Sequence, residues 1–349
     1  MNELEAYGWK PVFQQQLYEY DESLVPVRVI EVQRTGLKVA PTQSDHAEIT
    51  LGGRWFQMPP DERPTVGDWI LIDAAKGSAE VLLQRQGAIK RLAPDGELQL
   101  IAANIDTGFV VTSANSDFNI ARIERYLAAL MEAEIQPVVV ITKADLSEDT
   151  DQYRQQVEAL GLSVFVEVVD AREAPQLQGV AAWCTPGQSI ALLGSSGVGK
   201  STLVNTLMGH EVQDTQAARE GDDKGRHTTT HRSLHMLPSG AVILDSPGMR
   251  EFQLTDVDDG VGSVFHDVEQ LAEDCRFNDC AHGQEPGCAV QAAIAAGELD
   301  ERRLQSYFKL LREERFNTET IAERHARSRE FAKQVKQSGA RAKARRTGQ

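Results

Sequence analysis

The chain has 349 residues, of which 41% are hydrophobic and 25% are charged, and this length predicts two or three domains. Its formal net charge of -16 argues against non-specific binding to nucleic acid, because an acidic surface repels a polyanion unless basic residues cluster locally. No stretch approaches the roughly 20 apolar residues that a bilayer-spanning helix needs, and Met1 to Lys10 lacks a secretory signal, so we expect a cytoplasmic protein with no membrane role.

Residues 1–92 are predicted to form an all-β module. Short alternating runs are separated by glycine and proline, as in small barrels. The runs are Val25 to Val32, Leu37 to Ala40, Glu48 to Leu51 and Trp69 to Asp73. A five-stranded oligonucleotide-binding fold (OB-fold) is one candidate, and spacing alone does not separate it from other small barrels.

From residue 93 the pattern changes to strands that alternate with helices. A strand at Phe109 to Ser113 precedes a helix that Asn119 caps, and further strands are expected at 138–142, 164–169, 189–193 and 241–244. This alternation predicts an α/β domain with a mostly parallel sheet, whose ligands bind at the carboxyl ends of the strands.

A phosphate-binding loop lies between one of these strands and a helical run that starts at Thr202. The residues Gly194, Ser195, Ser196, Gly197, Val198, Gly199, Lys200 and Ser201 fit the pattern G-x-x-x-x-G-K-S. Glycines let successive N–H groups point at a polyanion, and the helix presents its positive end. We expect Lys200 to reach the β- and γ-phosphates and Ser201 to ligate Mg²⁺. The flanking strand and helix disfavour a chance glycine-rich turn.

Two segments after this loop are expected to respond to the γ-phosphate. Asp245 follows an apolar strand and is placed to hold Mg²⁺ through water, while Gly248 offers its N–H to the phosphate. Without the loop upstream, this stretch would be an ordinary turn. Thr228 to Thr230 lies in a polar stretch, and Thr229 is assigned to Mg²⁺ by its central position, with a plain surface loop as the alternative.

The segment Thr142-Lys143-Ala144-Asp145 ends a strand and resembles the guanine-recognition motif N-K-x-D. The Asp145 carboxylate can accept hydrogen bonds from guanine N1–H and the 2-amino group, whereas adenine offers no such pair of donors, and Lys143 can lay its stem along the base. As an isolated tetrapeptide the match is weak, and its place at a strand end carries the inference. Thr142 replaces the usual Asn, and a further base-contacting loop is expected at Asp170-Ala171, where Ser-Ala is usual.

The order of these motifs is reversed, since the guanine motif comes before the phosphate loop. A doubly wound sheet tolerates such a circular permutation when the original termini lie close together.

Hydrolysis of GTP needs an oriented water. The position just after Gly248, where many GTPases have Gln, is Met249, so slow intrinsic turnover is expected. His227 is the nearest polar candidate to position water when a partner orders its loop, and a structural or RNA-contacting role is the alternative.

Three of the four cysteines fall close together. Cys275, Cys280, His282 and Cys288 form C-x4-C-x-H-x5-C, which satisfies a tetrahedral Zn²⁺ with no open position and indicates a structural ion. Unrelated buried thiols near a surface histidine are the alternative. Cys184 lies apart from this cluster, and we expect it to be a small buried hydrophobic residue.

The barrel, the permuted GTPase domain, the Lys224-to-Thr230 segment and the Cys3His cluster together resemble the ribosome small subunit-dependent GTPase A (RsgA) family of bacteria. The likeness covers nearly the whole chain, including Ala102 to Asp106. It implies an OB-fold barrel at 1–92 that binds RNA, a circularly permuted GTPase domain at 93–256, and an α-helical zinc-binding domain with a basic tail at 257–349. Thr142, Asp170-Ala171 and the acidic balance depart from the family's pattern.

The resemblance implies a monomer that binds GTP and GDP, carries one Zn²⁺ and uses Mg²⁺ with GTP. Its implied partners are the 30S ribosomal subunit and its 16S rRNA, which stimulate hydrolysis in late assembly of that subunit. The tail from Lys333 to Gln349 has basic but no acidic side chains, so it is either solvated or in contact with rRNA. Two other functions remain open: a nucleotide-switched rRNA-binding protein in which hydrolysis is incidental, and a P-loop ATPase or kinase unrelated to ribosomes.

Overall fold

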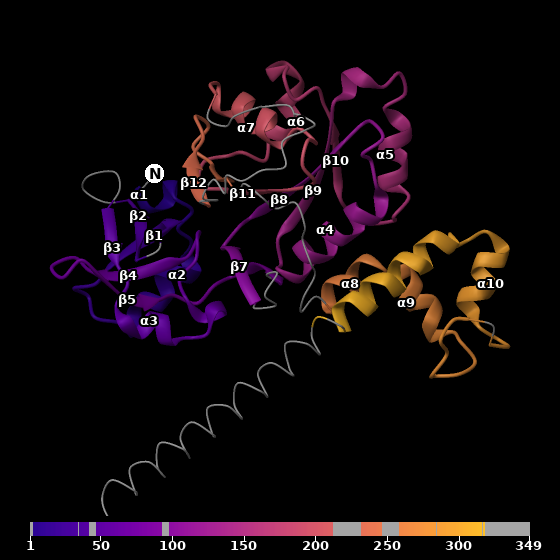
Figure 1. Cartoon of the computed structure of the whole chain (residues 1–349), viewed down its shortest axis with the longest axis horizontal. Helices are drawn as coiled ribbons and strands as arrows, with labels where there is room; N and C mark the ends of the chain where they lie inside the picture. Colours follow the sequence, from indigo (N-terminus) through magenta and orange to yellow (C-terminus); the bar gives the residue numbers. More distant parts are fainter. Residues whose placement is uncertain are drawn as a thin grey trace, which may run out of the picture.

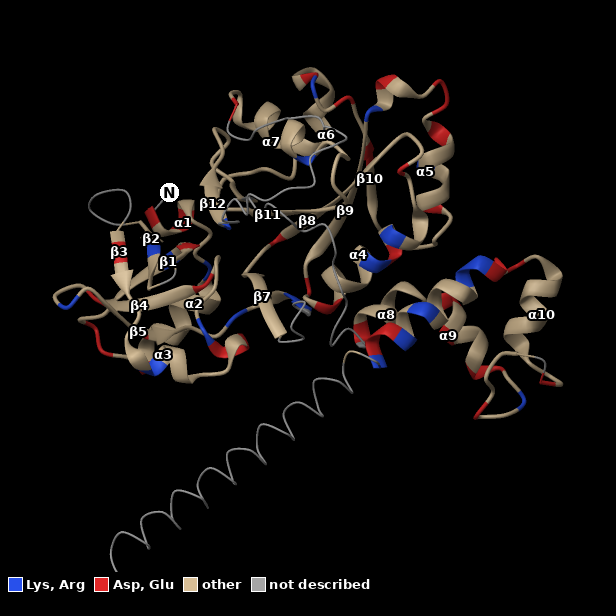
Figure 2. Cartoon of the chain, in the orientation of Figure 1, with Lys and Arg blue, Asp and Glu red and all other residues tan. Residues whose placement is uncertain are grey.

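The computed structural model describes residues 3–33, 35–41, 47–92, 98–211, 232–245, 258–283, 285–315 and 317. Three parts follow one another along the chain: a β-barrel, an α/β domain and a group of helices (Figure 1). Acidic residues occur on all three parts, with Lys and Arg interspersed among them (Figure 2). None of the helices within the described residues is both long and apolar enough to cross a membrane. The basic tail lies outside the described residues.

The barrel has five strands, which confirms the small barrel predicted near the start of the chain, although short helices that were not predicted occur in the same part. The strands are β1 (Val25–Val32), β2 (Gly36–Ala40), β3 (Ala47–Thr50), β4 (Trp69–Asp73) and β5 (Ser78–Leu82). Their order is β1-β2-β3-β5-β4, and the pairing of β4 with β1 closes the barrel. Alternate residues such as Val27 and Val29 face the apolar core, as the period of two in the sequence predicts.

Short helices surround this barrel. They are α1 (Glu3–Ala6), α2 (Pro11–Gln16), α3 (Gly53–Gln57) and the 3-10 turns η1 (Leu17–Glu19) and η2 (Pro60–Glu62). From α2, Phe13 packs on Trp69 of β4 with 6.0 Å between ring centroids, which attaches the first residues of the chain to the barrel wall.

The α/β domain has six strands in the order β10-β9-β8-β11-β13-β12. They are β8 (Thr107–Ser113), β9 (Gln136–Thr142), β10 (Phe165–Val168), β11 (Ser189–Leu193), β12 (Ser233–Met236) and β13 (Val242–Asp245). All neighbours pair in parallel except β12 and β13, which are antiparallel. Every residue of β8 and β11 is buried, as expected for central strands covered on both faces.

Helices cover the two faces of this sheet. They are α4 (Ile120–Glu132), α5 (Asp151–Glu158), α6 (Gln178–Ala181), α7 (Lys200–Met208) and the 3-10 turns η3 (Ala144–Leu146) and η4 (Ala174–Leu177). The Asn119 side chain accepts a hydrogen bond from the Arg122 backbone N–H at 3.0 Å, so the predicted cap of α4 is confirmed. The apolar face of α4, including Ile123 and Leu127, is buried.

The barrel and the α/β domain share one continuous sheet, because β1 pairs with β12 at Glu31 and Ser233. A separate ribbon of β6 (Ala88–Leu92) and β7 (Leu98–Ala103) lies between them. Arg28 is completely buried at this junction and donates to the Ser189 hydroxyl at 2.7 Å and the Asn104 carbonyl at 2.8 Å. The domain boundaries at 92 and 256 stay predictions.

The C-terminal helices are α8 (Asp258–Val264), α9 (His266–Glu273), α10 (Ala289–Ala296) and a helical segment at 301–315. Of these, α8 and the segment at 301–315 pack against α4, and α10 packs on α9. Glu124 of α4 is completely buried, and Arg303 donates to it at 3.0 Å while also pairing with Asp267 at 2.6 Å. A Cβ at Gly260 would lie 2.1 Å from the carbonyl oxygen of Ala128, so α8 and α4 approach at backbone distance.

Candidate functional site

The glycine-rich loop follows β11 in a conformation that only its glycines allow. A Cβ at Gly194 would lie 2.2 Å from the Val111 carbonyl oxygen, so β8 leaves no room for a side chain. Gly197 and Gly199 have φ of 79° and 95°, the left-handed region that L side chains rarely adopt. The sequence therefore folds here into the tight curl that a phosphate-binding loop requires.

Helix α7 begins at Lys200, directly after this curl. The Lys200 ammonium donates to the carbonyl oxygens of Gly194 at 2.7 Å and Ser195 at 2.5 Å, which keeps the charge over the loop. Ser201 and Thr202 occupy the first turn of α7, where the helix presents unpaired N–H groups and its positive end. This arrangement suits an anion such as a phosphate chain.

The predicted guanine motif begins where β9 ends. Lys143 has φ 57°, and this left-handed turn leads into η3, which contains Asp145. The Thr142 side chain is buried, and its hydroxyl lies 3.0 Å from the Thr112 carbonyl oxygen and 2.5 Å from that of Val198 in the phosphate loop. A Cβ at Gly199 would be 3.2 Å from the same hydroxyl. Thr142 therefore packs on the phosphate loop and joins the two motifs.

The segments predicted to read the base and to bind the phosphates thus meet at one edge of the sheet, although their order along the chain is reversed. This edge is formed by the carboxyl ends of β8, β9 and β11, the position at which parallel α/β sheets bind ligands. The hydroxyl of Thr142 is engaged by backbone carbonyls, so its observed contact is to the loop. A contact from Thr142 to the base stays a prediction.

A third loop, at residues 169–172, lies against both segments. The Val169 carbonyl accepts from the Ala144 N–H at 3.2 Å, and the Ala171 carbonyl accepts from the Thr206 hydroxyl of α7 at 2.7 Å. The Arg172 guanidinium, which was not expected here from the sequence, lies 2.8 Å from the Asp145 carboxylate. The feature of the sequence that could have indicated Arg172 is Asp170, which places a second carboxylate where serine is usual.

Arg172 also changes the electrostatics of its own loop. Its side-chain hydrogen bond lowers the pKa of Asp170 below the ordinary value, and the same bond raises the pKa of Arg172. Both groups therefore stay charged at neutral pH.

Another missed residue is Arg122, in the first turn of α4. Its Nη1 donates to the Ser195 hydroxyl at 2.5 Å, which places an exposed guanidinium beside the phosphate loop. The helix cap at Asn119 predicted this turn of α4, but nothing local indicates that the turn faces Ser195, because that contact joins two elements far apart in the sequence.

Asp245 ends β13, next to β11, so its backbone lies in the strand beside the one that leads into the phosphate loop. Its side chain, Thr229, His227 and Gly248 lie outside the described residues. The roles assigned to these four residues stay predictions.

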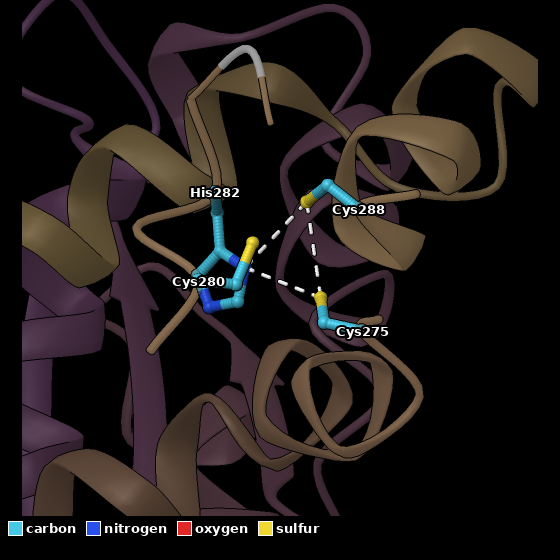
Figure 3. Close-up of side chains that lie close together, drawn as sticks. All are labelled: Cys275, Cys280, His282 and Cys288. Carbon is cyan, nitrogen blue, oxygen red and sulfur yellow. Dashed lines mark hydrogen bonds between the residues drawn. The ribbon is translucent and has the colours of Figure 1, made fainter. Parts of the chain in front are cut away.

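The four predicted metal ligands come together in the loop between α9 and α10 (Figure 3). Their ligand atoms all lie within 4.8 Å of one another. Cys275 Sγ is 3.5 Å and Cys288 Sγ 3.6 Å from His282 Nδ1, and the two sulfurs are 3.8 Å apart. Tetrahedral Zn²⁺ has bonds of about 2.3 Å to sulfur and about 2.05 Å to nitrogen. These bonds require about 3.6 Å between a sulfur and the nitrogen and about 3.8 Å between two sulfurs. The three observed separations fit zinc.

Surrounding contacts hold these ligands in place. Cys288 caps α10, where its sulfur accepts from the Gln291 N–H at 3.5 Å, and the Gln291 side chain donates to the His282 carbonyl at 2.7 Å. Such support orients a ligand set before the metal arrives. The cluster can therefore bind a metal ion, with His282 using Nδ1.

The family model described as RsgA GTPase matches residues 82–255. A relative from Vibrio vulnificus (strain CMCP6), "Small ribosomal subunit biogenesis GTPase RsgA 2", is 48% identical over 95% of this chain and 93% of its own length. This chain belongs to the RsgA GTPase family. It is accordingly a GTP-hydrolysing enzyme, as predicted from its motifs. A further family member, "Small ribosomal subunit biogenesis GTPase RsgA" from Mesorhizobium japonicum (strain LMG 29417 / CECT 9101 / MAFF 303099), is 45% identical over 89% of this chain and 90% of its own.

Two solved structures have a similar fold. YjeQ from Thermotoga maritima matches with a TM-score of 0.60 and 23% identity, covering 83% of this chain and 98% of that one. YloQ, described as a circularly permuted GTPase, matches with a TM-score of 0.57 and 22% identity over 83% and 94% of the two chains. The circularly permuted GTPase fold predicted from the sequence is therefore confirmed. An ABC transporter model also matches residues 177–344, a range that contains the same phosphate loop.

Proposed function

We propose that this enzyme hydrolyses GTP to GDP and phosphate when it is bound to the small ribosomal subunit, and that it acts as a late assembly factor of that subunit. The names of its relatives, as small ribosomal subunit biogenesis GTPases, support the partner. The single structural observation that supports guanine nucleotide as the ligand is the packing of Thr142 on Val198, because it brings the base motif beside the phosphate loop.

Within this proposal, one nucleotide spans both segments. Asp145 accepts from the guanine edge, Lys143 lies along the base, and the N–H groups of Gly194 to Ser201 hold the phosphates. Lys200 neutralises the β- and γ-phosphates. Mg²⁺, held with GTP by Ser201, Thr229 and Asp245, supplies charge neutralisation on the phosphates.

The proposed hydrolytic water is oriented by His227, since Met249 cannot form hydrogen bonds with its side chain. Intrinsic turnover is then slow, and contact with the subunit accelerates it by ordering the segment that carries His227. Gly248 offers its N–H to the γ-phosphate, so the segment that leads to the metal cluster differs between the GTP and GDP states.

The two flanking parts supply the contacts to rRNA in this proposal. The closed five-stranded barrel suits an oligonucleotide-binding fold, and its β1–β12 pairing couples it to the strand next to β13. The Cys3His cluster takes a structural Zn²⁺, because three thiolates and one imidazole leave no open position for catalysis. We further propose that the protein is a monomer in the cytoplasm, where ribosomal subunits are assembled.

GTP turnover with and without purified 30S subunits tests this function. We expect the subunits to raise turnover strongly, and to bind the protein more tightly with a non-hydrolysable GTP analogue than with GDP. Equal affinity in the two nucleotide states would favour the alternative of an RNA-binding protein in which hydrolysis is incidental. Absence of any stimulation would contradict the proposal.

A further inference from the structure

Arg172 lies between two carboxylates at the base-reading segment. Its Nη2 is 2.8 Å from Asp145 Oδ2 and 2.6 Å from Asp170 Oδ2, and its Nε is 2.9 Å from Asp170 Oδ1. The guanidinium therefore contacts Asp170 through two donors, Nη2 and Nε, and contacts Asp145 through Nη2 alone. We propose that Arg172 is a positioning residue that determines guanine specificity, because it fixes the orientation of the Asp145 carboxylate. This inference rests on the proposed role of Asp145 as the guanine acceptor.

The bridge is needed because Asp170 adds a second negative charge beside Asp145. Two carboxylates that share a site repel each other, and repulsion would turn the more exposed one away. Asp145 is the more exposed of the two, with 31% of its side chain accessible against 10% for Asp170. The planar guanidinium offsets both charges and fixes their relative geometry, which an ammonium group does less well.

Asp170 is itself held in place by hydrogen bonds. Its N–H donates to the Gln176 side chain at 3.0 Å, and its carboxylate also accepts from the Arg172 N–H at 3.0 Å. The neighbouring Ala171 carbonyl is held by Thr206 of α7, the helix that continues the phosphate loop. Arg172 therefore sets Asp145 in a fixed position relative to the loop that holds the phosphates.

Asp145 can accept from Arg172 and from a base at the same time. A carboxylate has two oxygens with about four acceptor sites, so one bond from Arg172 leaves sites for two donors of a base. Guanine supplies both N1–H and the 2-amino group, hypoxanthine supplies only N1–H, and adenine supplies neither at these positions. Displacement of Asp145 should therefore weaken the binding of guanine most, of hypoxanthine less and of adenine least.

Calorimetric titration of the full zinc-loaded chain with GDP, IDP and ADP tests the proposal. For Arg172→Ala we expect the GDP dissociation constant to rise about tenfold, the loss of one charge-assisted contact. We expect a smaller rise for IDP, so that the preference for GDP over IDP falls, and an intermediate effect for Arg172→Lys. Arg154→Ala is the matched control, since Arg154 donates to the Val166 carbonyl in the same domain and its removal should leave the preference unchanged.

A second variant separates positioning from a general loss of binding. In Asp170→Ser/Arg172→Ala the repelling carboxylate is gone and a hydroxyl donor takes its place, so we expect part of the GDP preference to return. Should Arg172→Ala reduce the yield of folded protein, Arg172→Gln gives the same comparison. An unchanged preference, or an equal loss for GDP, IDP and ADP, would overturn the proposal. Equal binding of GDP and ADP by the unmodified chain would instead contradict the guanine site itself.

Discussion

The Thr142 hydroxyl lies 2.5 Å from the carbonyl oxygen of Val198, a residue 56 positions later in the chain. This contact joins the end of β9 to the loop that follows β11. It also explains why threonine serves where asparagine is usual, because a short hydroxyl suffices to reach the loop backbone from β9.

Loss of this hydroxyl should loosen the phosphate loop. We expect Thr142→Val to lower the free energy of unfolding by about 1–3 kcal/mol, because a buried carbonyl loses its donor, and to weaken GDP binding several-fold. Chemical denaturation and GDP titration measure the two effects. Thr142→Ser, which keeps the hydroxyl, is the control and should retain most of both. Equal behaviour of the Val and Ser variants would show that the hydrogen bond has no such role.

Exchange of the Asp145 carboxylate, which we propose reads the base, should change which base is bound. In Asp145→Asn the amide both donates and accepts, so it no longer matches the two donors of guanine but can donate to the 2-carbonyl of xanthine. We expect GDP binding to weaken by about a hundredfold or more, since a site left with mispaired polar groups rejects its ligand, while XDP binding improves. Competition titrations with both nucleotides measure the switch. A variant that still prefers GDP would argue that the base lies elsewhere.

Removal of metal should release three thiols. Cys275, Cys280 and Cys288 converge on one point, whereas burial raises the pKa of Cys184 to about 12 and keeps that thiol protonated. We expect a thiol reagent to modify few cysteines in the native protein, three after a chelator is added, and the fourth only in denaturant. Metal analysis should give one Zn²⁺ per chain. Rapid modification of all three clustered thiols without chelator would contradict a bound ion.

The buried ion pair between α4 and the C-terminal helices should be essential for their docking. Glu124→Ala leaves Arg303 buried with Asp267 as its remaining carboxylate partner among the described residues, and we expect a loss of about 3–5 kcal/mol in the free energy of unfolding. The half-buried pair of Arg125 and Glu313 is the control, and Glu313→Ala should cost less than about 1 kcal/mol. Similar losses for the two variants would show that burial of Glu124 is not decisive.

Motifs with a fixed local geometry could be predicted from the sequence. The phosphate loop, the strand before it, the helix after it and the cap at Asn119 depend on residues within a few positions of one another, and all are present as expected. The Cys3His cluster was predictable for the same reason, because its ligands lie within one short segment and its chemistry limits the options.

Contacts between distant segments could not be predicted in this way. The pairing of β1 with β12, the buried Arg28 at the barrel junction and the bridge formed by Arg172 each join residues that are brought together only by the tertiary fold. Strand β12 was missed because it has only four residues, so its alternation of polar and apolar side chains is too short to identify a strand.

A crystal structure of the full chain with Mg²⁺ and a non-hydrolysable GTP analogue tests the central claim most directly. We predict one nucleotide with its guanine edge on Asp145 and its phosphates enclosed by Gly194 to Ser201. Phosphates held in that loop with the base turned away from Asp145, or a nucleotide bound at another place, would contradict the account.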